Sequence, residues 1–512
     1  MVVQRDWLVI GFFLNAHVCI CFFFEAQFSP LQENLKMDGN CSSLRRTAVA
    51  WSLKESTVAD NLEKQAALTR GIGLLEASST NMLQMIGIGP FITLPILLSA
   101  MGGPQALLGW FLAGIVALGD GLVWAELGAA LPGAGGPYHY LKEAYGPRSL
   151  GQMMSFIYIW ETTMSAPLSL ASGAVGLSLY VKFFWPSIGL AGQKLIAVFV
   201  CLTCMTLLYR EIRSVGKLSV ALWIVVMLTL GWVVVAGLMH FRMGLVLDFP
   251  QNAFQLSPHW FLGLGSATLI AMYSYGGYSN VCLFGGEVKN PTRTIPRSII
   301  YAILVVGTLY IIMSVTIVGV VPWREAIGIP YIVSEFIRRI YGSAAATVMT
   351  LLILCASLAS VFAAMLGYSR VPYAAAVDGR FFKVFANVHP TKHFPTFSLL
   401  FLGITSTLTC LLNLGMIISA LMVIQIVTQF IPQVLAVTMI RRYRKDIARP
   451  FRMWLYPVPS LVALAGWMWM LIGSGWHYIL LGSAILLFGI GAYLLQAKHN
   501  REWPFLQDQV TA

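Results

Sequence analysis

The chain has 512 residues, of which 58% are hydrophobic and only 11% are charged, and its mean hydropathy is +0.75. Soluble domains carry about 25% charged residues, so this composition excludes a water-soluble fold and indicates that the bilayer is the solvent. The net charge of +12 does not indicate nucleic-acid binding, because the basic residues lie in short connections between apolar runs.

The first part of the chain, residues 1–65, is a predicted N-terminal extension that contains an apolar run at 7–24. The run fits an extra span, an uncleaved anchor or a signal-like segment. Translation from an internal methionine such as Met37 would remove it altogether. Sequence patterns do not separate these alternatives.

Residues 66–500 form one predicted membrane domain, followed by a cytoplasmic tail at 501–512. About twelve apolar runs are long enough to cross roughly 30 Å of hydrocarbon, which takes about 20 helical residues. They predict an all-α membrane protein. The runs lie at 75–99, 104–131, 150–180, 191–209, 218–241, 259–285, 297–321, 344–376, 396–414, 415–440, 457–474 and 476–497.

The basic residues predict the topology. They concentrate in alternate connections, such as those with Lys142, Arg293 and the cluster at 441–452, whereas the intervening connections hold few. Loops rich in Lys and Arg remain on the cytoplasmic side. We therefore expect a multi-pass protein of the plasma or inner cell membrane, with both ends of the twelve-helix core in the cytoplasm.

Two of the runs are interrupted near the middle of the membrane. In 75–99, Gly87 and Gly89 precede Pro90, which cannot continue a helix but suits the first turn of a new one. In 259–285, Gly276 and Gly277 are adjacent. Glycines in membrane helices are also packing notches for neighbouring helices, and either interruption alone is better explained in that way.

The two interrupted runs stand five apart. This spacing favours a 5+5 inverted repeat with discontinuous helices 1 and 6 and a substrate between the breaks. Unwound backbone at membrane depth is tolerated only where a ligand, an ion or water satisfies it. N–H groups that begin a half-helix favour a carboxylate, and carbonyls that end one favour an ammonium group. A zwitterionic amino acid supplies both.

Several motifs resemble those of the amino acid–polyamine–organocation (APC) superfamily of transporters, of the amino acid permease type. The resemblance covers residues 66–497. The glycine break at 87–91 departs from the family pattern at Ile88 and Pro90, whereas the loop motifs match well. The motifs lie at 87–91, 124–127, 132–141, 286–296, 378–380 and 449–451.

The resemblance implies a LeuT-like fold with substrate contacts from spans 1, 3, 6 and 8. It implies that N–H groups around Ile88 and Gly89 hold a carboxylate and that carbonyls at 273–275 take an amino group. Tyr273 falls at the position of a gating aromatic, with an interfacial or packing tyrosine as the alternative. The candidate binding residues are Ile86, Gly87, Ile88, Gly89, Tyr273, Ser274, Tyr275, Gly276 and Gly277.

Intramembrane acids are candidates for coupling or gating. Asp120 and Glu126 lie in run 104–131, and Glu126 and Glu287 fit structural or gating ion pairs. Glu161 lies well inside run 150–180. It fits a coupled proton site, a partner for a cationic side chain of the substrate, or a hydrogen-bonded structural acid.

Certain expected features are absent from the sequence. Residues 218–236 contain no lysine, so the lysine that replaces sodium in some members of the resembled family is missing. Residues 180–193 contain no cysteine, so no disulfide-linked heavy subunit is expected. The pair Cys201 and Cys204 indicates apolar packing rather than a metal site. Ser357 and Ser360 offer hydroxyls for sodium or for helix contacts.

These observations predict a secondary transporter of amino acids or related small amines, driven by protons or by exchange. No cofactor and no enzymatic activity are expected, and the partners are a small-molecule substrate, lipid and protons. The alternatives are a polyamine or organic-cation transporter and an amino acid sensor that does not transport.

Overall fold

The computed structural model describes residues 71–133, 135–147, 149–209, 215–251, 253–377, 379–389, 395–500 and 502–505, without the side chains of 215–222. The predictions for 1–65, including the run at 7–24, and for most of the tail lie outside these residues. The helices described below belong to one compact unit, Ile72–Ala512.

This unit is helical throughout its described part, where the only extended pairings are two isolated bridges. The longer helices of its first half are α3 (Leu74–Met85), α4 (Gly89–Met101), α5 (Leu108–Ala130), α6 (Pro137–Ala144), α7 (Leu150–Val181), α8 (Leu190–Leu208), α9 (Val215–Met239) and α11 (Pro258–Tyr275). Those of its second half are α12 (Pro291–Val318), α14 (Ile332–Val377), α15 (Thr396–Thr409), α16 (Leu414–Gln425), α17 (Ile431–Tyr443), α18 (Val458–Ser474) and α19 (Trp476–Asn500).

Short elements connect these helices. They are the four-residue helices α10 (Met243–Val246) and α13 (Trp323–Ala326), the 3₁₀ turns η1 (Pro104–Leu107), η2 (Asn280–Leu283), η3 (Gly285–Glu287) and η4 (Lys383–Ala386), and the π-helix η5 (Ile426–Phe430). The π-helix joins α16 to α17, so this run is continuous but locally widened.

Seven helices of the described part are long and apolar enough to cross a membrane, or eight if the bent pair α3 and α4 counts as one span. Helices α15 and α18 and the described part of α9 are apolar but shorter. The predicted number of twelve spans therefore stays a prediction.

Proline and polar caps set where several helices begin. Ser257 caps α11 by accepting a hydrogen bond from the backbone N–H of Trp260 at 3.2 Å, and Pro258 occupies the first helical position. Prolines also begin α6 and α12. At the first position proline fixes a helical φ and removes an N–H that has no partner there, so it favours a helix start.

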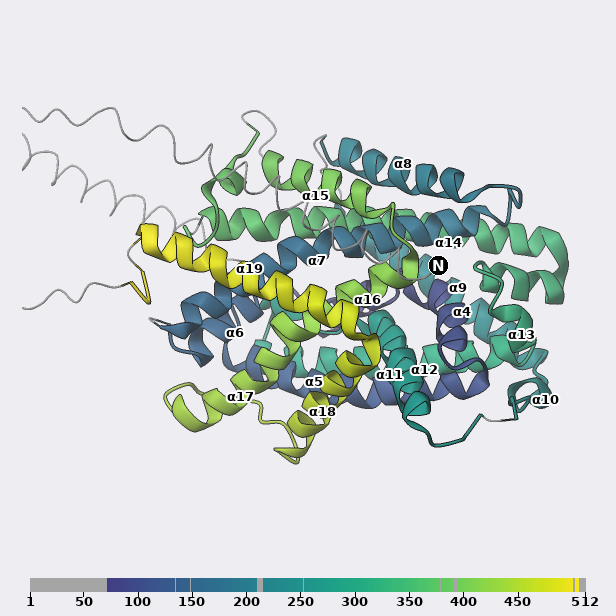
Figure 1. The fold of residues 1–512 in the computed structure, drawn as a ribbon, viewed down its shortest axis with the longest axis horizontal. Coiled ribbons are helices and arrows are strands. Elements are labelled where there is room, and N and C mark those ends of the chain that lie inside the picture. The colour runs from purple at the N-terminus through teal and green to yellow at the C-terminus, as the bar shows by residue number, and fades with distance from the viewer. Residues whose placement is uncertain are drawn as a thin grey trace, which may run out of the picture. The chain divides into compact units, whose positions relative to one another are not determined.

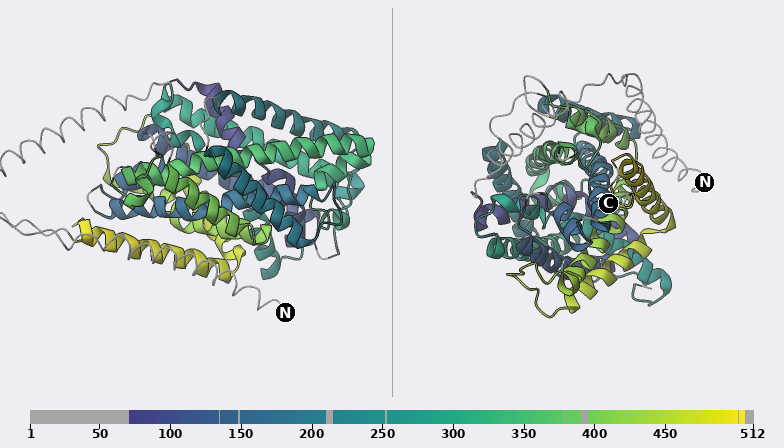
Figure 2. Two further views of the ribbon diagram at one scale, coloured as in Figure 1. Left: turned by 90° about the horizontal axis from the view of Figure 1, so that it is seen from above. Right: turned by 90° about the vertical axis from the view of Figure 1, so that its left-hand side faces the viewer.

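The helices pack in two neighbourhoods that contain the site. Helix α5 packs against α11, α12 and α18, while α7 packs against α8, α14, α15 and α16. Figure 1 shows α7 running along α14, and the end-on view in Figure 2 shows the long helices running in broadly similar directions. Helix α11 touches α4, and α14 touches α4, so the second half of the first broken run lies between both neighbourhoods.

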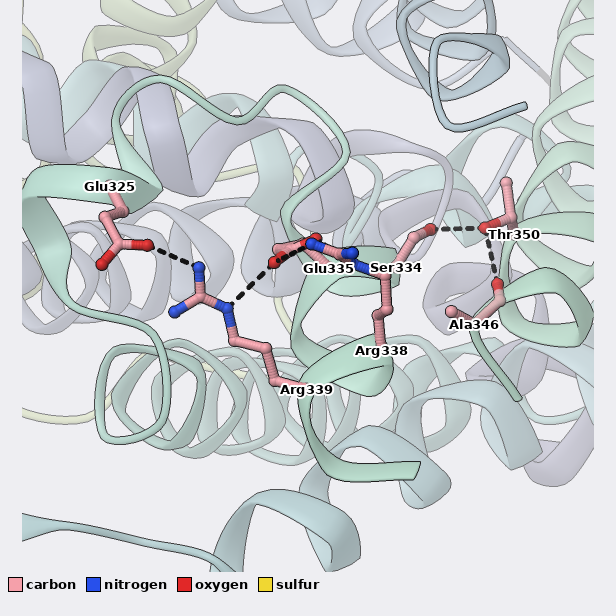
Figure 3. A network of polar contacts seen from close by, with 7 residues as sticks. All are labelled: Glu325, Ser334, Glu335, Arg338, Arg339, Ala346 and Thr350. Carbon is pink, nitrogen blue, oxygen red and sulfur yellow. Dashed lines mark hydrogen bonds and ion pairs between the residues drawn. The ribbon is translucent and has the colours of Figure 1, made fainter. Parts of the chain in front are cut away.

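Helix α14 is kinked at Gly342, whose φ is 83°, and a polar network lies at this kink (Figure 3). Arg339 bonds both Glu325 and Glu335, at 2.5 and 2.9 Å. Arg338 forms a two-pronged contact with the same Glu335 at 2.7 and 2.9 Å. Across the kink, Thr350 donates to the Ser334 hydroxyl and the Ala346 carbonyl, so polar contacts hold both sides of the bend.

Candidate substrate site

The first break separates α3 from α4 over residues 86–88, and the two helices are bent by 45°. The N–H groups of Gly87, Ile88 and Gly89 bond to no other described residue, whereas Ile86 N–H still bonds Met82 at 2.8 Å. Ile88 is 3% exposed, so most of this unpaired backbone is buried. A buried helix start with free N–H groups is a site for an anion.

The second break follows α11, which ends at Tyr275. Gly276 turns the chain and Gly277 has a φ of 112°, a conformation that favours glycine. The carbonyls of Ser274, Tyr275 and Gly276 accept no hydrogen bond from any described residue. Gly276 is exposed and Gly87 partly exposed, so backbone at both breaks is accessible. Free carbonyls at a helix end favour a cation.

The structure brings the two breaks together. A Cβ atom placed on Gly89 would lie 3.2 Å from the Ser274 hydroxyl, and one on Gly277 would lie 2.6 Å from Cγ of Gln84 in α3. The Ser274 hydroxyl also hydrogen-bonds that of Thr93 at 3.2 Å. The break that carries the free N–H groups therefore contacts the break that carries the free carbonyls.

Helices α7 and α14 complete the surroundings. The Ser360 hydroxyl of α14 lies 3.0 Å from the position of a Cβ on Gly87, and Ile88 packs against Gly176 of α7. Ser357, the other predicted serine, is buried and donates to the Ile353 carbonyl within its own helix at 2.6 Å.

Tyr273 bridges α11 and α7. Its hydroxyl bonds the Ser172 hydroxyl at 2.7 Å, and its ring lies 3.5 Å from the position of a Cβ on Gly89. The side chain thus lies over the first break and is held to α7 by one hydrogen bond. A single such bond contributes about 1 kcal/mol, so this contact can open at small cost.

Glu161 lies away from the breaks, eleven residues before Ser172 on α7, or about 16 Å at 1.5 Å per residue. It is 1% exposed. Its Oε2 accepts from Thr162 at 3.2 Å, while Oε1 has no hydrogen-bond partner in the described part of the chain.

The two other predicted acids lie elsewhere. Glu126 is 1% exposed and accepts hydrogen bonds from Arg441 of α17, one of them at 2.7 Å, and from the Met453 backbone at 2.9 Å. Glu287 belongs to η3, where its backbone carbonyl accepts from the N–H of Ile72 at 3.1 Å. Neither glutamate contacts the two breaks.

Sequence patterns did not single out several polar groups that hold the breaks. The Tyr310 hydroxyl donates to the Met85 carbonyl, and that of Tyr180 to the Phe91 carbonyl, both at 2.8 Å. Asn81 accepts from the Val281 N–H at 2.8 Å and joins the two broken runs. Its side chain is fully buried, but α3 also carries Glu76, Ser78 and Thr80, so one more polar residue gave no signal in the sequence.

A separate cavity of about 80 Å³ lies where α7, α8 and α16 meet, lined in part by Gln193, Lys194 and Cys410. Its lining includes no residue of either break, so we do not associate it with the site.

A family model described as amino acid permease matches residues 72–501. Branched-chain amino acid permease BcaP of Bacillus subtilis is 25% identical over 471 residues, which cover 88% of this chain and 97% of that protein. Serine/threonine exchanger SteT of the same organism is 25% identical over 407 residues, covering 78% and 90%. Human large neutral amino acids transporter small subunit 2 is 27% identical over 446 residues, covering 84% and 81%. Since the family model spans most of the chain, this chain belongs to the amino acid permease family and is a multi-pass membrane protein of the APC superfamily.

Proposed function

We propose that the chain is a secondary transporter that moves amino acids across the plasma membrane by alternating access. One observation carries the proposal: the break with free N–H groups at Gly87, Ile88 and Gly89 contacts, through Gly89 and Ser274, the break with free carbonyls at 274–276. This arrangement matches the carboxylate and the ammonium group of one zwitterion. The proposed architecture is a 5+5 inverted repeat of twelve spans, with both ends in the cytoplasm.

The substrate we favour is a neutral amino acid. The side chains that contact the breaks, including Thr93, Ser274 and Ser360, carry no charge. A cationic substrate would leave its side-chain charge unpaired there, which is costly at membrane depth. The names of the three relatives, which refer to branched-chain, hydroxylated and large neutral amino acids, support the same class.

In this mechanism Tyr273 is the gate that closes over the substrate from the outer side, and its bond to Ser172 opens and closes. Glu161 is the proton-coupling candidate, because one of its carboxyl oxygens has no hydrogen-bond partner among the described residues. The alternative is that exchange of one amino acid for another, rather than a proton gradient, drives uptake. The pair of Glu126 and Arg441 closes the cytoplasmic side, and Glu287 is proposed as a second gating acid there.

The proposal is tested with purified protein in liposomes. Labelled branched-chain, hydroxylated, large neutral and cationic amino acids, and a polyamine, are offered with and without a pH gradient or internal amino acid. We expect accumulation or exchange of a neutral amino acid. Binding in detergent without any uptake would instead identify a sensor, and preferred uptake of the polyamine would identify an organic-cation carrier.

A pair of matched variants tests the location of the site. Gly89→Val places a branched side chain against Ser274 and Tyr273 and is expected to abolish amino acid binding. Gly491→Val makes the same change in α19, where nothing lies within 4 Å of the added Cβ, and serves as the control for folding. Normal binding by folded Gly89→Val protein would contradict this site.

A further inference from the structure

A second intramembrane acid, Asp120, lies in the middle of α5 and has no part in the mechanism above. It is fully buried. Its Oδ2 accepts a hydrogen bond from the Tyr278 hydroxyl at 2.5 Å, and its Oδ1 accepts one from the Trp467 indole at 3.1 Å. Tyr278 follows the α11 break and Trp467 belongs to α18, so this carboxyl group joins three parts of the fold.

Neutral donors, rather than cations, surround this carboxyl group in the described part of the chain; Trp124, one turn further along α5, is a third donor near it. Helix α18 contains no Asp, Glu, Lys, Arg or His. The Asp, Glu, Lys, Arg and His side chains on the other helices packed against α5 lie near helix ends: His259 in α11, Arg293 and Arg297 in α12, and Arg441 and Arg442 in α17.

The remaining titratable groups nearby have other partners. Glu126 on α5 pairs with Arg441. Tyr275 donates to the Trp110 carbonyl at 3.3 Å, and Tyr310 to the Met85 carbonyl. An ionised Asp120 therefore has no counter-charge close by, and a buried carboxylate without one is costly, so binding a proton is the available route to neutrality.

The two partners determine where a proton can bind. An indole N–H only donates, so Oδ1 must remain an acceptor in either protonation state. The proton is then best placed on Oδ2, the oxygen that faces Tyr278, because a protonated oxygen is a poor acceptor for the indole. A phenol can donate or accept, so protonation reverses this one hydrogen bond and releases the hydroxyl hydrogen of Tyr278 from Oδ2.

The two donors to Asp120, Tyr278 and Trp467, are both buried but belong to different kinds of segment. Trp467 is fully buried and stacks on Phe430 of the π-helix, with ring centroids 4.2 Å apart and planes 9° apart. Tyr278 instead follows directly after Gly277, whose backbone packs on Gln84 of the other broken run. Reversing the hydrogen bond therefore shifts the segment that follows the α11 break rather than α18, which carries Trp467.

We propose that Asp120 is a proton-binding site that sets the position of the segment after the α11 break through Tyr278. The inference rests on the proposed transport function and adds a positioning residue that does not touch the substrate. Asp120→Asn fixes the neutral arrangement, because its amide can accept from Trp467 and donate to Tyr278.

The first test is the pH profile of uptake in liposomes. For Asp120→Asn, the uptake ratio between acidic and neutral pH is expected to be smaller than that of the wild type, because this titrating group is gone while Glu161 remains. Glu143→Gln, a partly exposed acid outside this cluster, should keep the wild-type profile. If Asp120→Asn keeps the wild-type profile at reduced rate, the residue is only structural and the proposal is wrong.

The second test does not depend on transport. Infrared difference spectra between about pH 4 and pH 9 report the C=O stretch of a protonated carboxylic acid in the reconstituted protein. We expect a band that Asp120→Asn removes and that Tyr278→Phe, which loses the hydrogen bond but keeps the acid, shifts. A spectrum unchanged by both variants would overturn the proposal, whereas the band without any uptake would overturn only the transport function. If Asp120→Asn does not fold, the shift of the C=O band in Tyr278→Phe tests the proposal by itself, and an unshifted band would overturn it.

Discussion

At the scale of single residues, the site depends on positions where a side chain has no room. Gly87 and Gly89 leave the start of α4 open to Ser360 and Ser274, and a Cβ atom at either position would press on a hydroxyl. In the proposed site, the backbone groups are open to a ligand only because these two side chains are missing. Binding should therefore respond to very small changes in volume.

Gly87→Ala is expected to weaken amino acid binding about tenfold, because overpacking a tight contact costs about 1–3 kcal/mol. The clashing atom is the Ser360 hydroxyl at 3.0 Å, while Cβ of Ser360 is 3.9 Å away. Ser360→Ala in the same chain should therefore restore most of the affinity. Equilibrium binding of the labelled substrate measures both effects, and failure of the second change to rescue the first would exclude this contact as the cause.

At the scale of elements, one ion pair fastens α5 to α17 and to the loop before α18. Glu126 is 1% exposed and Arg441 is 17% exposed, and the guanidinium also lies 3.8 Å from the ring centre of Tyr456. Because the carboxylate also accepts from the Met453 backbone, three segments meet at a single acid. Removing that charge leaves a largely buried cation without its partner.

Glu126→Gln is accordingly expected to lower the free energy of unfolding by on the order of 3 kcal/mol. Glu143→Gln is the matched control: Glu143 is 30% exposed and its partner Arg444 keeps Asp446, so the loss should stay within about 1 kcal/mol. Denaturant unfolding in micelles compares the two. Equal losses would show that burial does not distinguish these pairs.

The network before the kink of α14 predicts a pH dependence. Burial alone would raise the pKa of Glu335, but hydrogen bonds and charge from Arg338 and Arg339 outweigh it and lower the pKa. A lowered folded pKa contributes stability that is present above the unfolded value and lost as the pH falls through the folded one.

Arg339→Gln should therefore lower stability by about 1 kcal/mol at neutral pH, since Arg339 is 29% exposed, Glu325 is 54% exposed, and the buried Glu335 keeps Arg338. The difference from the wild type should shrink as the pH falls below about 4, because Glu335 takes up its proton at a higher pH in the variant than in the wild type. Melting curves of the detergent-solubilised proteins measure this. A difference that stays constant down to pH 3, roughly one unit below the usual glutamate value, would contradict the assignment.

At the scale of the whole molecule, features that are periodic or local in the chain could be predicted from the sequence. Gly87, Gly89 and Pro90 indicated a break, and the structure ends α3 at Met85 and begins α4 at Gly89. Contacts between residues that are far apart in the sequence could not be predicted. Nothing local to Asn81 or Asp120 indicates Val281 or Tyr278, because such pairs arise only when helices pack. The same limit applies to Glu126, whose partner lies 315 residues away.

The orientation of the molecule in the membrane yields the last prediction. If the basic connections are cytoplasmic, the loop between α17 and α18 faces inward and the loop before α11 faces outward. Leu455 and Leu256 are 81% and 73% exposed in these two loops, so each can be replaced by cysteine at little structural cost. We expect a membrane-impermeant maleimide added to intact cells to label Leu256→Cys above the wild-type background and to leave Leu455→Cys unlabelled until the membrane is permeabilised. The opposite pattern would invert the whole chain, and with it the side from which Tyr273 closes the site, while leaving the contacts between the two breaks unchanged.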